Sequence, residues 1–343
     1  MKILITGASG FIGSFLCEEA LRRGYDTWAG VREHSSRKFL KDERLHFAVL
    51  NIADKSALSS QLSSLKPLLT PNSSLLTPNS SLLTPHSSLL TPAEGRNGWD
   101  VIIHAGGATK CLTKEEFYKN NFECTKNFIE VLDELDMMPR QFIYLSSLSV
   151  EGNSSYGASK LMTESYIKTK NFVPYVMIRP TGVYGPREKD YFVMVQSIAQ
   201  HTDFAVGNDQ KLTFIYVADL VGAIFAAIDK GVTHRTYNIA DGNVYASRTF
   251  SDLIQRELGV KWVLHIKAPL WFLKIVTDIS DWWARHITKR PATLNKDKYH
   301  IMAQRDWSCD ITPMLTELEY QPQYDLERGV KETVKWYKDN NWL

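Results

Sequence analysis

Three side chains able to move a proton or hold a reacting oxygen lie within a short stretch. Ser147 ends the apolar run QFIYLSS, and Tyr156 and Lys160 stand in the segment YGASK. Residues four apart on a helix share one face, so a helical segment places the phenol beside the ammonium. A phenol with a pKa of about 10 is a poor proton relay at neutral pH, and a nearby cation lowers that pKa. We predict Ser147, Tyr156 and Lys160 as a catalytic set for reducing a carbonyl, in which Ser147 positions the substrate oxygen.

The chain begins with a glycine-rich turn between an apolar run and a helical pattern. KILIT is followed by Gly7, Gly10 and Gly13, and then by FIGSFLCEEALRRG. Glycines allow a tight turn and a close approach to a pyrophosphate, and the N-terminus of the next helix offers N–H groups to the anion. The spacing is G-x-x-G-x-x-G rather than the more usual G-x-G-x-x-G. The residues of this turn that we predict to bind a dinucleotide cofactor are Gly7, Ser9, Gly10, Phe11, Ile12 and Gly13.

The end of the second apolar run bears on the choice of cofactor. NAD sites usually have an acidic residue there, about 20 residues after the turn, which binds the ribose hydroxyls. This chain has Val31 followed by Arg32, with Arg37 and Lys38 close behind. An arginine pairs with a 2′-phosphate that an aspartate would repel. We therefore predict NADP as the cofactor and Arg32 as a ligand, with NAD as the alternative if these charges are only a solvated surface.

Alternating strands and helices must position these residues. KILITG, DTWAGV, LHFAVL, DVIIHAGG and QFIYLSS are short and apolar, as strands buried on both faces are. Helical patterns separate them, which predicts an α/β fold with a doubly wound parallel sheet of the Rossmann type. Such sheets bind ligands at the carboxyl ends of their strands. Asn51 and Ile52 fall where the third strand ends, and we expect them at the adenine.

A change of pattern and a repeat divide the chain. We predict a dinucleotide-binding domain over 1–180 and a smaller mixed substrate-binding lobe over 181–343, partly interleaved with the first. Within the first domain, LLTPNSS recurs with a period of seven residues. Proline in every repeat forbids a continuous helix, and Ser, Thr and Asn favour turns. We interpret 67–98 as an exposed, poorly ordered insertion.

The C-terminal quarter is rich in tryptophan, with seven of the nine located there. In the stretch PLWFLKIVTDISDWWARHI, one helical stripe contains Phe272, Ile275, Ile279 and Trp283. We expect this stripe to pack in the core. A lid over an apolar substrate and contact with a membrane surface are the alternatives.

The composition excludes several classes of protein. The 343 residues are 44% hydrophobic and 23% charged, which are globular values. A net charge of +2 gives no case for a nucleic-acid partner. No apolar stretch reaches about 18 residues, so we expect no spanning helix and no stable membrane insertion. The N-terminus is already a strand, which leaves no room for a signal peptide and predicts a cytoplasmic protein.

The four cysteines indicate neither a disulfide framework nor a metal centre. Cys17, Cys111, Cys124 and Cys309 form no C-x-x-C pair, and no histidine cluster completes a zinc site. We expect reduced thiols and no metal.

Taken together, the motifs resemble those of a known family. TGASGFIG, HAGG, Ser147 with YGASK, and RPTGVYGPR are similar to the extended short-chain dehydrogenase/reductases, the NAD(P)-dependent epimerase/dehydratase group. The resemblance covers nearly the whole chain outside 67–98, and it supports the roles of Ser147, Tyr156 and Lys160. It also implies a possible homodimer. The further cofactor-binding residues that we take from it are Ala105, Gly106, Gly107, Asn121, Tyr156, Lys160 and Pro180.

For three other residues the resemblance implies supporting roles. Asn121 lies in a helix near the cofactor and is expected to support the site. His104, the first residue of HAGG, is expected to be packed rather than catalytic. Asp219, in FIYVADL, is expected to be structural in the substrate lobe.

Three departures from the family pattern narrow the function. Glu151 replaces the tyrosine of a common V-Y-G motif. Only eight residues separate Ser147 from Tyr156, so we expect a more open pocket or substrate contacts taken over by the C-terminal lobe. Leu148 and Ser149 stand where sugar-nucleotide 4,6-dehydratases have an Asp-Glu pair, so elimination lacks its usual acid and base.

Three functions remain open. The first is an NAD(P)-dependent oxidoreductase or epimerase acting on a nucleotide sugar, a small-molecule substrate. The second is an NADPH-dependent reductase or dehydrogenase of a small or hydrophobic ketone, because the closing segment is similar to the dihydroflavonol reductase and 3-beta-hydroxysteroid dehydrogenase branch. The third is a non-catalytic sensor that keeps the cofactor pocket.

Overall fold

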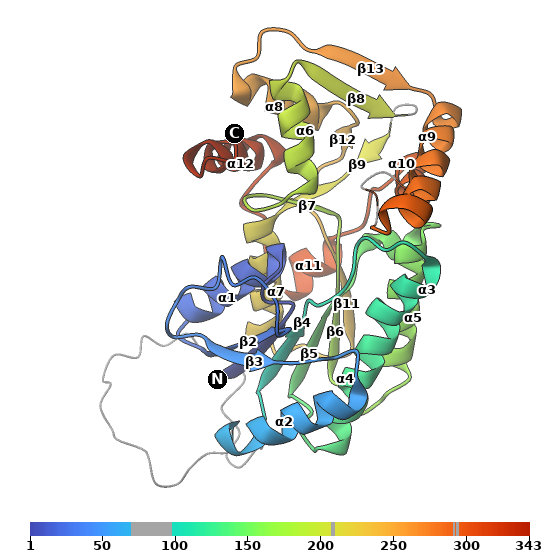
Figure 1. The fold of residues 1–343 in the computed structure, drawn as a ribbon. Helices are drawn as coiled ribbons and strands as arrows, with labels where there is room; N and C mark the ends of the chain where they lie inside the picture. Colours follow the sequence, from blue (N-terminus) through green and yellow to red (C-terminus); the bar gives the residue numbers. More distant parts are fainter. Residues whose placement is uncertain (70–97, 207–209, 291, 293–294) are drawn as a thin grey trace.

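A seven-stranded parallel sheet, with strands from both halves of the chain, has helices on both of its faces (Figure 1). The computed structural model describes residues 1–69, 98–206, 210–290, 292 and 295–343. The strand order is β11-β6-β5-β4-β1-β2-β3, and each neighbouring pair is parallel. This confirms the predicted doubly wound α/β fold. The strands are β1 (Lys2–Thr6), β2 (Asp26–Val31), β3 (His46–Val49), β4 (Val101–His104), β5 (Gln141–Leu145), β6 (Tyr175–Pro180) and β11 (Arg235–Ile239).

Helices from both halves of the chain cover the sheet. One face carries α1 (Phe11–Arg22) and α7 (Val217–Asp229), which also pack on each other (Figure 1). The other face carries α2 (Lys55–Leu69), α4 (Cys124–Glu134) and α5 (Ser155–Lys168). Between β4 and α4 lie the short α3 (Lys114–Phe117) and a π-helical turn, Tyr118–Glu123. The predicted insertion 67–98 lies outside the described residues over 70–97, whereas α2 continues through Pro67 to Leu69.

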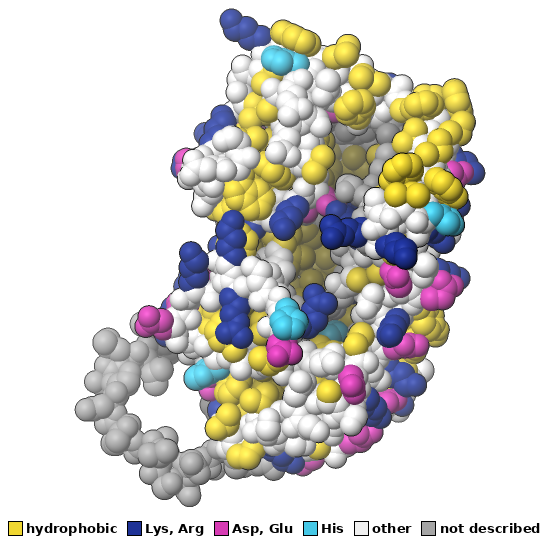
Figure 2. Space-filling model, viewed as in Figure 1, with side chains coloured by type: hydrophobic (Ala, Val, Ile, Leu, Met, Phe, Trp, Pro, Cys, Tyr) yellow, Lys and Arg dark blue, Asp and Glu magenta, His cyan; other side chains and the backbone are white. Residues whose placement is uncertain are grey.

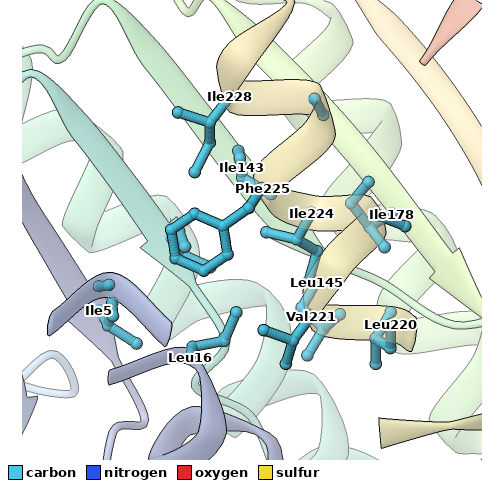
Figure 3. Packing of buried hydrophobic residues seen from close by; sticks show 14 of the residues in the cluster. Ile5, Leu16, Ile143, Leu145, Ile178, Leu220, Val221, Ile224, Phe225 and Ile228 are labelled. Atoms are coloured by element: carbon cyan, nitrogen blue, oxygen red, sulfur yellow. The ribbon is translucent and has the colours of Figure 1, made fainter. Parts of the chain in front are cut away.

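The alternation of side chains along the strands builds two cores. Successive residues of a strand point to opposite faces. In β1, Ile3 and Ile5 enter the core under α1 and α7, whereas Leu4 enters the core under α2 and α4. Figure 3 shows the first core, in which Phe225 and Ile228 of α7 lie over the sheet. A strand buried on both faces reads as a continuous apolar run, which is why the strands are visible in the sequence.

The C-terminal lobe contains small sheets and helices. In its described part, three two-stranded sheets pair β7 (Gly182–Tyr184) with β10 (Phe214–Tyr216), β9 (Lys211–Leu212) with β12 (Tyr245–Ala246), and β8 (Thr202–Val206) with β13 (Leu264–Ala268). The helices are α6 (Asp190–Ala199), α8 (Thr249–Leu258), α9 (Leu270–Trp283), α10 (Lys296–Ala303), α11 (Thr312–Glu317) and α12 (Leu326–Asp339). A π-helical turn, Ala284–Thr288, follows α9.

Asp219 of α7 ties the lobe to the sheet domain. Its carboxylate accepts hydrogen bonds from the Tyr320 hydroxyl and from the backbone N–H groups of Gln323 and Tyr324, each at 2.8 Å. These contacts give Asp219 the structural position that was expected for it.

The expectation that the α9 stripe packs in the core is wrong. Phe272, Ile275, Ile279 and Trp283 are each 47–61% exposed, and Figure 2 shows apolar side chains gathered over this part of the lobe. The opposite face of α9 packs inward instead. Periodicity shows that a helix has an apolar face, but it does not show which way that face turns.

A packed histidine connects β1, β4 and α4. The ring nitrogens of His104 contact the hydroxyls of Thr6 at 2.7 Å and Thr125 at 3.0 Å. Burial, with a smaller contribution from the Lys160 cation, lowers the pKa of His104 to about 3. The ring is therefore neutral in the folded protein at neutral pH.

This histidine should make stability depend on pH. In the unfolded chain, His104 takes up a proton below about pH 6.5, whereas in the fold it does so only near pH 3. Unfolding therefore becomes easier as the pH falls through that window, by up to about 1.4 kcal/mol per pH unit. His104→Gln removes the titration, and urea unfolding at a series of pH values should show a shallower loss of stability. An identical pH slope in the two proteins would contradict the argument.

Candidate active site

Ser147 and Tyr156 meet at the carboxyl end of β5. The strand ends at Leu145, and the Ser147 Oγ caps a short 3₁₀ turn, Leu148–Glu151, by accepting the N–H of Ser149 at 3.1 Å. The Tyr156 phenol lines the same cavity as Ser147, and the Ser147 side chain acts against the rise in the pKa of Tyr156. The structure thus places the predicted serine and tyrosine on one cavity at the end of β5.

The helix that carries Tyr156 is held at its N-terminus from both halves of the chain. The Ser154 Oγ accepts the N–H of Gly157 at 2.9 Å. The carboxylate of Asp297, in α10 of the C-terminal lobe, accepts the N–H groups of Ser155 and, at 3.4 Å, Tyr156. An anion is favourable at a helix N-terminus. Sequence analysis missed Asp297, because a contact across 141 residues leaves no local signal.

Lys160 is buried beneath the predicted cofactor turn. Its Nζ donates to the Leu145 carbonyl at 2.8 Å and lies 4.8 Å from the centre of the Tyr144 ring. Gly107 lies directly above it, since a Cβ there would be 3.2 Å from Nζ. Burial lowers the pKa of Lys160 to about 8, and the Glu164 carboxylate opposes this shift.

The expected lowering of the Tyr156 pKa by Lys160 does not occur in this structure. Burial raises the pKa of Tyr156 to about 12; the hydrogen bond with Ser147 opposes the rise, and the Asp297 carboxylate adds to it. The ammonium of Lys160 is engaged with the Leu145 carbonyl. The phenol is therefore protonated at neutral pH in the chain alone.

A buried ion pair lies behind the reacting groups. Arg179 binds the Glu164 carboxylate through two nitrogens, at 2.9 and 2.5 Å, and the Ser146 hydroxyl donates to it at 2.6 Å. The two-nitrogen ion pair links β6 to α5, and the Ser146 hydroxyl links the same carboxylate to the end of β5. Glu164 was also missed, although it lies four residues beyond Lys160 in the same helical stripe as Tyr156, a visible signal.

The N-terminal turn has the geometry of an anion cradle. Gly7 has φ +69°, and a Cβ there would lie 2.8 Å from the Gly106 nitrogen. The Gly10 N–H donates to the Gly7 carbonyl at 2.9 Å. Helix α1 starts immediately afterwards at Phe11, and no side chain of the described residues caps its first turn. These N–H groups and the helix dipole suit a pyrophosphate, so the residues present fit a dinucleotide.

Asn121 holds the loop that follows β4 in place. Its side chain accepts the N–H of Ala108 at 2.7 Å and donates to the Ala108 carbonyl at 3.0 Å and to the Ser159 hydroxyl at 2.9 Å. The residue lies in the π-helical turn, an irregularity that is frequent at functional sites. Asn121 therefore couples the loop after β4 to the helix that carries Tyr156 and Lys160.

One cavity of about 800 Å³ joins most of these groups, and a hollow between the two parts of the molecule is visible in Figure 2. Its volume is within the range of small-molecule sites. The predicted residues that line it are Gly7, Gly10, Phe11, Ile12, Gly13, Ala105, Gly107, Ser147, Tyr156, Lys160 and Pro180.

Six predicted residues are placed outside this lining. Ser9 and Gly106 belong to the two turns, and Asn121 is buried behind them. Arg32 is exposed just beyond β2. Asn51 donates its N–H to the Gln61 side chain at 2.8 Å, and the Ile52 carbonyl accepts from Asn127 at 3.4 Å.

The C-terminal lobe supplies the far wall of the cavity. Its contribution is largely apolar, from residues that include Met194, Phe214, Phe250, Met302 and Trp307. A polar cluster lies among them, in which Asp190 binds Lys110 and, at 3.4 Å, Lys298. Within the described part of the chain, no group of three or more His, Cys, Asp or Glu is placed to hold a metal ion.

Comparisons with known proteins identify the class. The model of the NAD dependent epimerase/dehydratase family matches residues 3–69 and 84–240, and the chain belongs to that family. It is an enzyme family whose cofactor is NAD(P).

The individual relatives are distant. The chain is 28% identical to an uncharacterized UDP-glucose epimerase of Bacillus subtilis, over 87% of this chain and 93% of that protein. It is 22% identical to a sterol-4-alpha-carboxylate 3-dehydrogenase (decarboxylating) of Candida albicans, over 70% and 77%. It is similar to the structure of dTDP-glucose 4,6-dehydratase from Bacillus anthracis in complex with NAD, with a TM-score of 0.71, 18% identity, and coverage of 100% and 98%.

The close approach at Gly7 can be tested with a matched glycine. Gly7 and Gly24 have similar positive φ angles, +69° and +74°, but a Cβ at Gly24 meets nothing within 4 Å. Both alanine variants should lose about 1 kcal/mol of folding stability, because a residue with a Cβ is strained at a positive φ. Only Gly7→Ala should also push the two turns apart and lose cofactor binding, measured by titration with NADP(H) and NAD(H). Equal cofactor binding by the two variants would contradict the role of the Gly7 turn in holding the pyrophosphate.

Proposed function

We propose that this chain is an NAD(P)-dependent oxidoreductase or epimerase that transfers a hydride at a secondary alcohol or ketone of a nucleotide sugar. The observation that carries the proposal is the single cavity lined by the glycine turn, by Tyr156 and Lys160, and by the C-terminal lobe. The names of relatives support the substrate class, since they include a UDP-glucose epimerase and a dTDP-glucose 4,6-dehydratase in complex with NAD.

The chain's own residues handle the proton. A bound nicotinamide supplies or accepts the hydride. Tyr156 donates its phenolic proton to the substrate oxygen in reduction and takes it back in oxidation. Ser147, which lines the same cavity, holds the same substrate oxygen. Lys160, which lies below Gly107, would bind the nicotinamide ribose.

Dehydration is disfavoured by the residues next to Ser147. Leu148 is buried and apolar, and the Ser149 N–H is used to cap the turn. Neither side chain is a carboxyl group, so this position offers no acid and base for elimination. We therefore favour oxidoreduction or epimerisation.

A reductase or dehydrogenase of a hydrophobic ketone is the second candidate. The apolar far wall of the cavity favours it, and one relative is a sterol-4-alpha-carboxylate 3-dehydrogenase. The two are separated by absorbance at about 340 nm, because a reductase consumes the reduced cofactor with its substrate and an epimerase causes no net change. Nucleotide sugars and apolar ketones are screened with both cofactors, and the sugars are also followed by product chromatography.

Tyr156→Phe tests the proton transfer. With the substrate that the screen identifies, turnover should fall by about 10²-fold or more, because the acid is lost. Cofactor affinity, measured by fluorescence titration, should remain. Tyr166→Phe is the matched control, since Tyr166 lies on the same helix but contacts Glu130 at 3.2 Å, away from the cavity. Full activity of the Tyr156 variant would overturn the assignment.

We further propose that Arg32 makes the site prefer NADP(H). It follows β2 directly, and its N–H donates to the Ser35 hydroxyl at 3.1 Å, so a cation and a hydroxyl stand together there. Strand β2 is the neighbour of β1 in the parallel sheet, so Arg32 lies at the carboxyl edge of the sheet, where such folds bind ligands. A 2′-phosphate at this position would pair with the Arg32 guanidinium and the Ser35 hydroxyl.

Arg32→Ala should weaken the binding of NADP(H) by about 10- to 100-fold, as expected for a lost charge-assisted hydrogen bond. The affinity for NAD(H) should remain nearly unchanged. Arg44→Ala is the control, because Arg44 is exposed and pairs with Asp42 at 2.7 Å. Dissociation constants of both cofactors are compared at one ionic strength. An equal loss for the two cofactors would refute the role of Arg32.

A further inference from the structure

Helix α9 has its apolar face turned outward. Six large apolar side chains, each 47–66% exposed, form what we call the α9 face: Trp271, Phe272, Ile275, Ile279, Trp282 and Trp283. The inward side of the same helix carries Leu273, Thr277 and Asp281, all buried. An ordinary surface helix is arranged the other way round. Figure 2 shows the result, a continuous apolar area over α9 at one side of the lobe.

The segment that carries the α9 face is rich in basic residues. From Lys261 to Arg290 the chain has six Lys or Arg and only two Asp. Both carboxylates are already matched: Asp278 by Lys274 at 3.0 Å and Lys296 at 3.5 Å, and Asp281 by Arg285 at 3.0 Å. Lys267, Lys289 and Arg290 are exposed at the two ends of the helix segment. The charge left over is positive.

We propose that the α9 face docks the enzyme peripherally on an anionic lipid surface. Helices that lie in the membrane interface combine one large apolar face, rich in Trp and other bulky side chains, with Lys and Arg nearby. Tryptophan prefers the headgroup level, and cations there attract anionic lipids. Among the residues that the structure describes, no helix is both long and apolar enough to cross a bilayer. The helix would lie on the surface.

Charge favours lipid over a second copy of the chain. In a two-fold interface each patch meets itself, so the cations around one α9 would face those around the other. An anionic bilayer meets the same cations with opposite charge. The docking helix also packs on α10, whose Lys298, Ile301 and Met302 line the active-site cavity. Docking would therefore hold one wall of the cavity near the membrane.

The test uses the full chain and vesicles of phosphatidylcholine with or without phosphatidylglycerol. The protein should float with the anionic vesicles, with a blue shift of tryptophan emission, and should be released by salt. Ile275→Glu/Ile279→Glu places charges on the exposed face and should reduce flotation by about tenfold or more. Phe172→Glu/Val193→Glu, also at exposed apolar positions, is the matched control and should float like the original chain.

A second variant keeps the apolar face intact. Lys267→Glu/Arg290→Glu reverses charge only and should lose the preference for anionic vesicles, while circular dichroism verifies folding of all variants. The proposal is overturned if the chain binds neither kind of vesicle, or if Ile275→Glu/Ile279→Glu binds as well as the original. It is also overturned if the chain is a dimer that ignores vesicles and this variant is a monomer, since the face is then an interface between copies.

Discussion

Lys160 brings an ammonium group out of water and into the edge of the sheet, between the Leu145 carbonyl and the Tyr144 ring. A buried charge is unfavourable unless it is paired, and here burial lowers its pKa to about 8. The carboxylate of Glu164, one turn further along α5, opposes this lowering. That carboxylate would itself be an isolated charge without the fork from Arg179 on β6. The buried ammonium of Lys160 therefore depends on an ion pair that does not line the cavity.

The same lysine links the two sides of the site. A Cβ at Gly107 would fit tightly, at 3.0 Å from the Asn121 Oδ1 and 3.2 Å from the Lys160 Nζ. Gly7 must lack one because the turn after β4 occupies its space. Strands β1 and β4 are neighbours in the sheet, so the turn that suits a pyrophosphate and the loop above the lysine are packed backbone against backbone. A small shift of either turn would move the cofactor relative to the phenol, and distances of this kind decide rates of hydride and proton transfer.

Sequence reasoning succeeded where the physics is local. The sheet was predictable because strands buried on both faces are continuous apolar runs, and so was the position of Tyr156 and Lys160 on one helix, because four residues make about one helical turn. Sequence reasoning failed where an outcome depends on what surrounds a residue. Burial and the Asp297 carboxylate raise the pKa of Tyr156, against the opposing effect of Ser147. On the inner side of α9, Thr277 and Asp281 are buried while the apolar stripe is exposed. Asp297 could not be found at all, since only the fold brings it to α5.

Asp297 shows that the lobe does more than supply a wall for the cavity. The loop between Ser147 and Tyr156 is short, and the C-terminal lobe lies directly on it: a Cβ on Gly152 would lie 2.8 Å from the Gln304 side chain and 3.3 Å from Trp307. Asp297 reaches the first N–H groups of the helix that begins with this loop. It is one residue before Lys298, which lines the same cavity. Asp297 therefore joins α10 of the lobe to the start of α5, so the position of the helix that carries Tyr156 depends on a carboxylate from the other part of the molecule.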